Sequence, residues 1–152
     1  MEILSLFSED WVDLNQKADN ILELFESVNK DLLSKGLVND GYLMGVTERE
    51  KIFPTGLITQ YLNISLPHSD TKYIEEPFVY IVRLNEPIIV KQMGDSQEME
   101  VKDLFFLGIK NPSEQVGLLS KIMELFMNED FVKEYKKVET SKETIELIKK
   151  YL

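Results

Sequence analysis

The stretch VKDLFFLGI, residues 101–109, decides the fold that this sequence predicts. It is a nearly continuous apolar run, which is expected of a strand whose two faces are both buried. Such a strand needs other elements against both of its faces. The segments on either side of it supply candidates for these elements.

The segments before this stretch predict further strands and two helices. PFVYIVRL is rich in β-branched and aromatic residues and predicts a strand over 78–84, and PIIV, after it, predicts a shorter one. NISL, residues 63–66, alternates polar and apolar residues and predicts a short strand that ends before a proline. Apolar residues at helical spacing predict helices over about 17–35 and from about 39 to just before Pro54, and a short strand is predicted around 11–14.

The segments after the stretch predict two more helices. Asn111 followed by Pro112 fits a helix cap and a first helical position, with the helix running to about Met127. Thr140 with Glu143 makes a capping box that opens a final helix. The fold class predicted from these elements is α/β: a single-domain sandwich over residues 1–152, in which helices flank a small mixed β-sheet on both faces.

The composition excludes several classes of function. The chain has 152 residues and a formal charge of -10, so we expect no nucleic-acid partner. It has no cysteine and one histidine, so we expect no disulfide, no thiol nucleophile and no metal site. No glycine-rich phosphate-binding motif and no nucleophile elbow occurs, and we expect no cofactor. Without a signal peptide or a long apolar run, the expected location is the cytoplasm.

The single histidine, His68, is the candidate reactive group that remains. It lies in NISLPHSD, residues 63–70, directly after a proline. A neutral imidazole is a nucleophile at physiological pH and accepts a phosphoryl group directly. The hydroxyls of Ser69 and Thr55 and the guanidinium of Arg49 are candidate donors to phosphoryl oxygens. The alternative is that His68 is a loop histidine at a strand end with no chemical role.

Two neighbouring segments, TEREKIFPTGL and NISLPHSD, resemble the phosphoacceptor region of a known family. The family is the enzyme IIA components of the bacterial phosphoenolpyruvate:sugar phosphotransferase system, in the fructose-mannitol superfamily. Its pattern is Arg-Glu, then Thr-Gly, then Pro-His, which correspond here to Arg49–Glu50, Thr55–Gly56 and Pro67–His68. PTGL together with NPSEQVGLL indicates the galactitol-type subgroup. The resemblance implies the mannitol/fructose-type enzyme IIA fold.

The resemblance also implies a function and partners. His68 is then expected to take a phosphoryl group from the phosphohistidine of the histidine-containing phosphocarrier protein. It passes this group to an enzyme IIB subunit, whose acceptor is commonly a cysteine, and the membrane enzyme IIC takes part later, during transport. The resemblance makes Arg49 the stabilising cation, with Thr55 and Ser69 as weaker candidates.

The sequence departs from the resemblance at one position. The fructose-mannitol branch often has a second histidine near the start of the helix after the buried strand, and the corresponding residue here is Gln115. A glutamine amide can donate a hydrogen bond to a phosphoryl oxygen but cannot change its protonation state. Gln115 is therefore a candidate site residue, and the alternative is a surface glutamine in a first helical turn.

Two other functions remain open at this stage. A regulatory protein of the same fold would use phosphorylation of His68 as a signal to another protein. A non-catalytic interaction module would have the fold without phosphoryl transfer, although the presence of Arg49, Thr55 and His68 together argues against it.

Overall fold

A computed structural model describes residues 2–152. Its five strands form one mixed sheet in the order β1-β4-β5-β3-β2. β1 pairs parallel with β4 and β3 parallel with β5, whereas β4–β5 and β2–β3 are antiparallel pairs. The strands are β1 (Val12–Gln16), β2 (Gly56–Ile58), β3 (Asn63–Ser65), β4 (Phe78–Lys91) and β5 (Glu98–Gly108).

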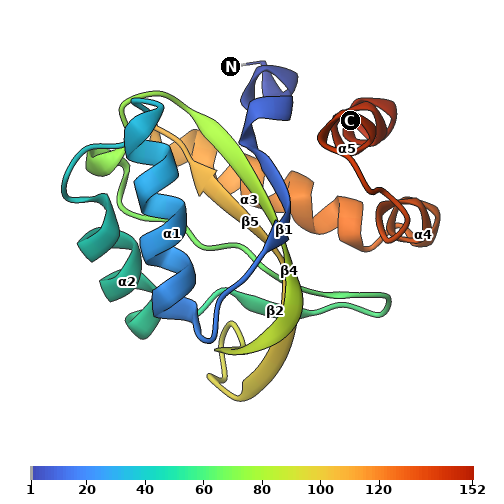
Figure 1. Cartoon of the computed structure of the whole chain (residues 1–152), viewed down its shortest axis with the longest axis horizontal. Helices are drawn as coiled ribbons and strands as arrows, with labels where there is room; N and C mark the ends of the chain where they lie inside the picture. The colour runs from blue at the N-terminus through green and yellow to red at the C-terminus, as the bar shows by residue number, and fades with distance from the viewer. Residues whose placement is uncertain (1) are drawn as a thin grey trace.

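Helices cover both faces of this sheet, as Figure 1 shows. α1 and α2 pack on one face, and α3, α4 and α5 pack on the other. The helices are α1 (Ile21–Ser34), α2 (Tyr42–Ile52), α3 (Pro112–Phe126), α4 (Glu129–Tyr135) and α5 (Ser141–Tyr151), with short 3-10 turns at Ile3–Leu6, Glu9–Trp11 and Thr71–Tyr73. The predicted α/β sandwich with a mixed sheet is confirmed.

The stretch that decided the prediction lies in β5, in the interior of the sheet. Alternate residues of β5 face opposite helical layers, so that Phe105 packs with α3 and α4 while Phe106 packs with α1. Both phenylalanines are fully buried. The apolar run is therefore continuous because both faces of this strand are covered.

Local sequence signals set the helix ends. The side chain of Asn111 accepts a hydrogen bond from the backbone N–H of Ser113, and Pro112 follows it as the first helical residue. Thr140 accepts from the N–H of Glu143, as the capping box predicts. Both predicted starts are confirmed, because capping depends only on residues within one turn.

One prediction about the elements is wrong, and two elements were not predicted. PIIV is not a separate strand but the second half of β4, and the register shifts between Arg83 and Ile88, where a proline interrupts the pairing. The short strand β2 was not predicted. The C-terminal region holds two helices beyond α3, because α4 precedes the predicted final helix.

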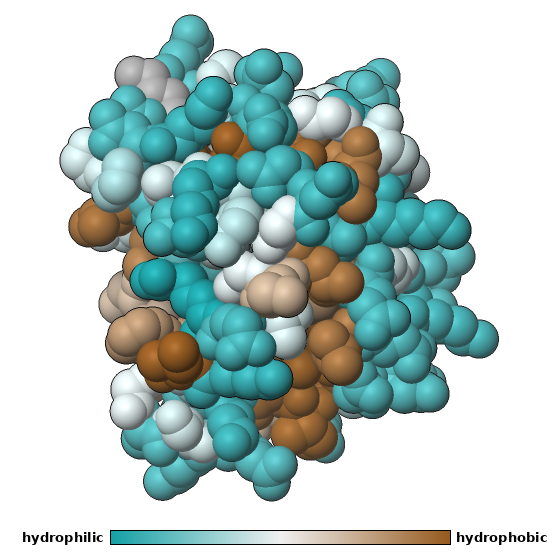
Figure 2. All heavy atoms as spheres, turned by 90° about the vertical axis from the view of Figure 1, so that its left-hand side faces the viewer, coloured by the Kyte–Doolittle hydropathy of each residue, from teal (hydrophilic) through white to brown (hydrophobic). Residues whose placement is uncertain are grey.

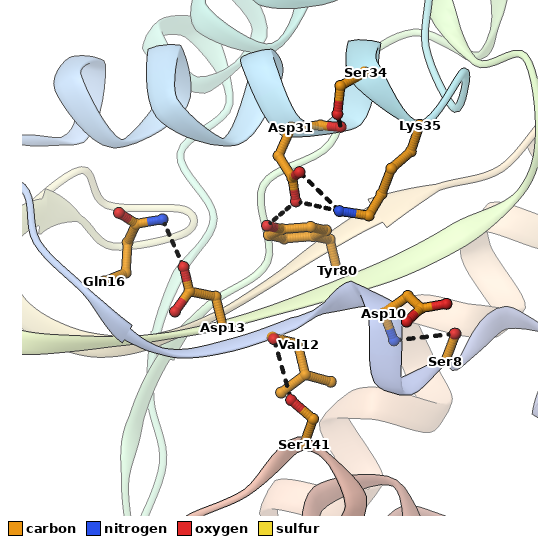
Figure 3. Close-up of polar contacts among 10 residues, drawn as sticks. All are labelled: Ser8, Asp10, Val12, Asp13, Gln16, Asp31, Ser34, Lys35, Tyr80 and Ser141. Atoms are coloured by element: carbon orange, nitrogen blue, oxygen red, sulfur yellow. Dashed lines mark hydrogen bonds and ion pairs between the residues drawn. The ribbon is translucent and has the colours of Figure 1, made fainter.

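Polar contacts fasten the edge strand and α1 to the sheet, as Figure 3 shows. Tyr80 of β4 donates from its hydroxyl to Asp31 of α1, and Lys35 pairs with the same carboxylate at 2.7 Å. The hydroxyl of Ser141 in α5 donates to the backbone oxygen of Val12 in β1. These contacts lie on both sides of β1 and β4 and hold the two helical layers against the sheet.

Candidate functional site

His68 lies just beyond the end of β3, beside β5. The loop continues alongside β5, where His68 bridges to Leu107 and the Leu107 N–H donates to the carbonyl of Pro67 at 3.0 Å. The histidine side chain is almost enclosed, with 9% of its surface exposed. A rigid strand of the central sheet therefore positions the imidazole.

One ring nitrogen of His68 is engaged and the other is open. Nδ1 lies 2.9 Å from the backbone oxygen of Leu66. A carbonyl only accepts, so Nδ1 carries the proton in this contact and Nε2 keeps its lone pair. Within residues 2–152 Nε2 has no hydrogen-bond partner, and it is not among the enclosed polar atoms, so it faces solvent.

The surroundings of His68 favour its neutral form. Burial lowers the pKa of His68 below the ordinary value of 6.5, the Leu66 carbonyl opposes this, and the positive charge of Arg49 lowers the pKa further. The imidazole is therefore mostly unprotonated at neutral pH, with a lone pair available on Nε2.

Arg49 stands in α2, near its C-terminal end, close enough to His68 to affect its pKa. Its guanidinium carbon lies 5.3 Å from the centre of the Phe53 ring. Its Nε atom is buried without a hydrogen-bond partner, and within the described part of the chain no carboxylate lies within ion-pair distance of it. This cation is therefore not neutralised by residues 2–152, and it is suited to binding an anion beside the imidazole.

Thr55 is buried and does not hydrogen-bond to His68. Its backbone N–H and its hydroxyl both reach the carboxylate of Glu50, at 2.9 and 2.8 Å. Its Oγ1 also lies 3.0 Å from Oγ of Ser65, which is completely buried in β3. The structure thus places Thr55 between α2 and β3, the strand that precedes the histidine loop.

Ser69 and Gln115 meet on the other side of His68. The side-chain amide of Gln115, in the first turn of α3, donates to the backbone oxygen of Ser69 at 3.3 Å. The Ser69 hydroxyl donates to the carbonyl of Asp70 at 2.9 Å. Asp70 itself caps the following 3-10 turn by accepting from the N–H of Lys72. The loop after His68 is therefore held by its own hydrogen bonds and by α3.

The sequence alone gives no role to half-buried Glu50 or to completely buried Ser65 in this region. The sequence pattern includes Glu50 in its Arg-Glu pair, but the partial burial of this residue depends on how α2 packs against the rest of the fold. Burial raises the pKa of Glu50, the two hydrogen bonds from Thr55 oppose this in part, and the resulting pKa is about 7. Ser65 was read only as the polar half of an alternating strand.

The described residues contain no group of three or more His, Asp or Glu side chains that could hold a metal ion. None of the helices built from residues 2–152 has the length and apolar character needed to cross a membrane.

Comparison with known proteins gives one family and several relatives. The family model for the phosphoenolpyruvate-dependent sugar phosphotransferase system, EIIA 2, matches residues 5–151. The galactitol-specific EIIA component of the phosphotransferase system from Escherichia coli K12 is 26% identical over 110 residues, which cover 72% of this chain and 73% of that protein. The transcriptional regulator ManR of Bacillus subtilis is 27% identical over 128 residues, which cover 83% of this chain but 18% of the regulator.

Solved structures of similar fold come from the same group of proteins. A phosphotransferase-system IIA protein, PtxA of Streptococcus mutans, superposes with a TM-score of 0.79 at 18% identity, covering 99% of this chain and 95% of that one. The mannitol-specific IIA of Escherichia coli, in its complex with phosphorylated mannitol-specific IIB, gives a TM-score of 0.75 at 18% identity, covering 95% and 97%.

Proposed function

The chain belongs to the EIIA 2 family of the phosphoenolpyruvate-dependent sugar phosphotransferase system, and on that premise we propose that it carries a phosphoryl group on His68. The donor is the phosphorylated histidine-containing phosphocarrier protein, and the acceptor is a sugar-specific enzyme IIB subunit, with a cysteine as its acceptor. Sugar is phosphorylated afterwards, during transport through enzyme IIC. Residues 1–152 act as one domain, and the transfer takes place in the cytoplasm.

The state of the His68 ring carries this proposal. Nδ1 is tied to the Leu66 carbonyl while Nε2 has an open lone pair. As Nε2 forms its bond to phosphorus, the bond between phosphorus and the donor histidine breaks. The product ring keeps the Nδ1 proton and gains positive charge, which the Leu66 carbonyl stabilises by accepting that proton in a hydrogen bond.

The other candidate residues act on the transferred group or on the loop. Arg49 supplies the positive charge that stabilises the phosphoryl oxygens. The side-chain amide of Gln115 and the hydroxyl of Ser69 lie beside the loop and are available as further donors, since each makes only a weak or local contact in the free protein. Thr55 links α2 to β3 through its hydrogen bonds with Glu50 and Ser65.

Exposed apolar residues near Arg49 and Gln115 suit docking of a protein partner. Ile52 and Phe53 end α2 beside Arg49 with 66% and 60% of their surface exposed, and Val116 follows Gln115 with 67% exposed. Such residues form the centre of many protein interfaces. Figure 2 shows apolar atoms gathered in separate patches on the face that bears α1 and α2. The mannitol-specific relative was solved in complex with phosphorylated IIB, which supports a IIB partner here.

The proposed sugar is a polyol like galactitol. The relatives named galactitol-specific EIIA support this assignment. The sugar itself binds to enzyme IIC, so that growth on galactitol, with and without the gene for this chain, tests the assignment.

Mass spectrometry of the intact protein tests the carrier function. The protein is incubated with phosphoenolpyruvate, enzyme I and the phosphocarrier, in parallel with the variant His68→Ala. We expect one acid-labile phosphoryl group on the wild type and none on the variant. Because the chain has a single histidine, a phosphohistidine found on it can only be His68.

Two results would contradict the proposal. A wild-type protein that gains no mass, while a known IIA is labelled in the same mixture, is not a carrier for these donors. A phosphoryl group that persists on His68→Ala would assign the acceptor to another residue.

A regulatory role is the second candidate, and the similarity to part of ManR favours it. The phosphoryl group would then stay on His68 and alter binding to another protein. Adding purified IIB subunits to the phosphorylated chain separates the two roles. Loss of the phosphoryl group to a IIB supports the carrier role, whereas retention with every IIB of the cell supports regulation. A non-catalytic interaction module would show no labelling at all.

A further inference from the structure

Glu50 is a half-buried carboxylate whose two hydrogen bonds both come from Thr55, ahead of the phosphoacceptor loop. Oε2 accepts from the backbone N–H of Thr55 at 2.9 Å and Oε1 accepts from the Thr55 hydroxyl at 2.8 Å. Within residues 2–152 no lysine or arginine forms an ion pair with it. Shielding a carboxylate from water without a cation beside it is unfavourable, so the two hydrogen bonds from Thr55 are what stabilise its charge.

The contacts continue from Thr55 to the histidine in short steps. The Thr55 hydroxyl meets that of Ser65 at 3.0 Å, and the Thr55 carbonyl accepts from the N–H of Leu66 at 3.3 Å. The carbonyl of Leu66 then accepts from Nδ1 of His68 at 2.9 Å. A connected series of hydrogen bonds thus runs from the last turns of α2 to the imidazole.

The start of this series lies next to the cation of the site. Glu50 and Arg49 are consecutive in α2, so their side chains leave the helix about 100° apart and do not face each other. Glu50 therefore fastens α2 to β3 while Arg49 stays available to an anion. The relative placement of the cation and the nucleophile depends on this contact.

We propose that Glu50 is a positioning residue for phosphoryl transfer. Through Thr55 and Ser65 its carboxylate holds the end of α2 against β3, so that Arg49 stands beside His68 in the geometry of transfer. This inference rests on the proposed carrier function. The Glu50–Thr55–Ser65 contact is called the clamp below.

The clamp depends on the ionised form of Glu50. A carboxylate accepts both hydrogen bonds from Thr55, so the Thr55 hydroxyl must accept from Ser65. Protonation replaces one acceptor of Glu50 with a donor and reverses or removes a bond of the clamp. Because burial raises the pKa of Glu50 to about 7, this change falls within the physiological range.

Other charges also face the region around Glu50. Lys51 of α2 and Lys91 and Glu98 of the β4–β5 hairpin line the same cavity of about 340 Å³. The positive charges of the two lysines and the negative charge of Glu98 offset one another in part. Neither lysine is within ion-pair distance of Glu50 in the described structure. A change with a midpoint near pH 7 that disappears in Glu50→Gln therefore reports Glu50.

The test compares Glu50→Gln, Thr55→Val and Ser65→Ala with the wild type. The initial rate of phosphorylation by the phosphocarrier is measured as a function of pH. The final mass of the protein gives the number of phosphoryl groups transferred. Glu48→Gln, at an exposed acidic position on the same helix, is the matched control. Thr55→Ser, which keeps the hydroxyl, is the conservative variant.

We expect Glu50→Gln and Thr55→Val to reach one phosphoryl group per chain at a rate about tenfold below that of the wild type. The wild-type rate falls as pH drops through about 7, and Glu50→Gln lacks this fall. The double variant Glu50→Gln with Thr55→Val loses no more rate than either single variant, since both changes break the same clamp. Thr55→Ser recovers most of the rate, and Glu48→Gln behaves as the wild type.

A wild-type rate and pH profile in Glu50→Gln would overturn the proposal. A rate lost in Glu50→Gln without any change in pH profile would also overturn it, because it would indicate a merely structural glutamate. If Glu50→Gln fails to fold, by its thermal melting, then Thr55→Val and Ser65→Ala decide the outcome through the same pH profile.

A second readout separates this proposal from the carrier function. The chain has one histidine, so its ring protons give one set of NMR signals, which can be followed through a pH titration without phosphorylation. The clamp predicts two inflections in the wild type, one from His68 and one near pH 7 from Glu50, and only the first in Glu50→Gln. If the protein is not phosphorylated in the mass assay but shows two inflections, the carrier function is refuted and the clamp is retained. One inflection in the wild type would sink the clamp whatever the carrier does.

Discussion

The chain has two arginines, and they occupy opposite kinds of environment. Arg83 of β4 pairs with Asp103 of β5 at 3.2 Å, and its terminal nitrogens donate to the carbonyls of Tyr135 and Val138, each at 2.7 Å. Arg49, near the end of α2, has the Phe53 ring as its contact and a buried Nε without a partner among residues 2–152. One guanidinium donates three hydrogen bonds to the protein, and the other donates none within residues 2–152.

The difference indicates what each arginine does. Arg83 satisfies carbonyls at the end of α4 and joins that helix to the sheet, which is a structural task. Arg49 has unused donors beside a neutral imidazole, which is the arrangement needed to bind a doubly charged phosphoryl group. The same contrast separates Asp103, which has a cation, from Glu50, which has none in the described part of the chain.

The largest effect in this comparison is expected for Arg83→Ala. The change leaves Asp103 and two carbonyls buried without their partner, which lowers the free energy of unfolding by about 3–5 kcal/mol. Urea denaturation at neutral pH measures it. A loss below about 1 kcal/mol would contradict the structural role of this arginine.

Arg49→Ala is expected to reduce the rate of phosphoryl transfer while leaving stability nearly unchanged. The rate of phosphoryl transfer falls by about 100-fold, which corresponds to about 2.7 kcal/mol, while the free energy of unfolding changes by less than about 1 kcal/mol. Because the charge of Arg49 lowers the pKa of His68, its removal raises that pKa, which the single histidine signal in NMR reports directly. An unchanged pKa would place Arg49 too far from the ring to assist it.

Glu50→Gln sharpens the comparison through stability. A pKa raised from 4.5 to about 7 means that the folded state holds the proton more tightly than the unfolded state. Its contribution to stability is complete below the unfolded value of 4.5 and is lost as pH rises through about 7. Between about pH 5 and about pH 8 the wild type should lose about 2 kcal/mol relative to Glu50→Gln. An equal difference in unfolding free energy between the two proteins at all pH values would refute the raised pKa of Glu50.

The smallest effect is expected for Phe53→Ala, which removes an exposed ring beside Arg49. We expect KM for the phosphocarrier to rise about fivefold with little change in kcat, because the ring contributes to docking rather than chemistry. Met127→Ala is the matched control, since this residue is at least as exposed but follows α3 at the end opposite Gln115. A fall in kcat alone would show that Phe53 acts by holding Arg49.

Features that depend on neighbouring residues were predictable from the sequence. The caps at Asn111 and Thr140, and the two-sided burial of residues 101–109, follow from local pattern and are present in the structure. The short strand β2 was missed because its three residues show no period. PIIV was separated from β4 because Pro87 reads as a strand break, although it lies where the ladder shifts.

The site was predictable in part, and for a physical reason. Residue types and spacing led to His68, Arg49 and Thr55 as candidates, because an unpaired nucleophile and a cation have visible chemistry. The hydrogen bond between Nδ1 and the Leu66 carbonyl and the partial burial of Glu50 form only when α2, β3 and β5 pack together. Similarly, Arg83 finds partners more than 50 residues away, beyond any local pattern.

One measurement tests most directly whether Nε2 of His68 is the atom that accepts the phosphoryl group. The protein is labelled with isotopic nitrogen in its single histidine, phosphorylated through the phosphocarrier, and examined by NMR for coupling between nitrogen and phosphorus. We predict a one-bond coupling to Nε2, with the proton retained on Nδ1 next to the Leu66 carbonyl. Coupling to Nδ1, or no coupling in a protein whose mass includes a phosphoryl group, would contradict this assignment.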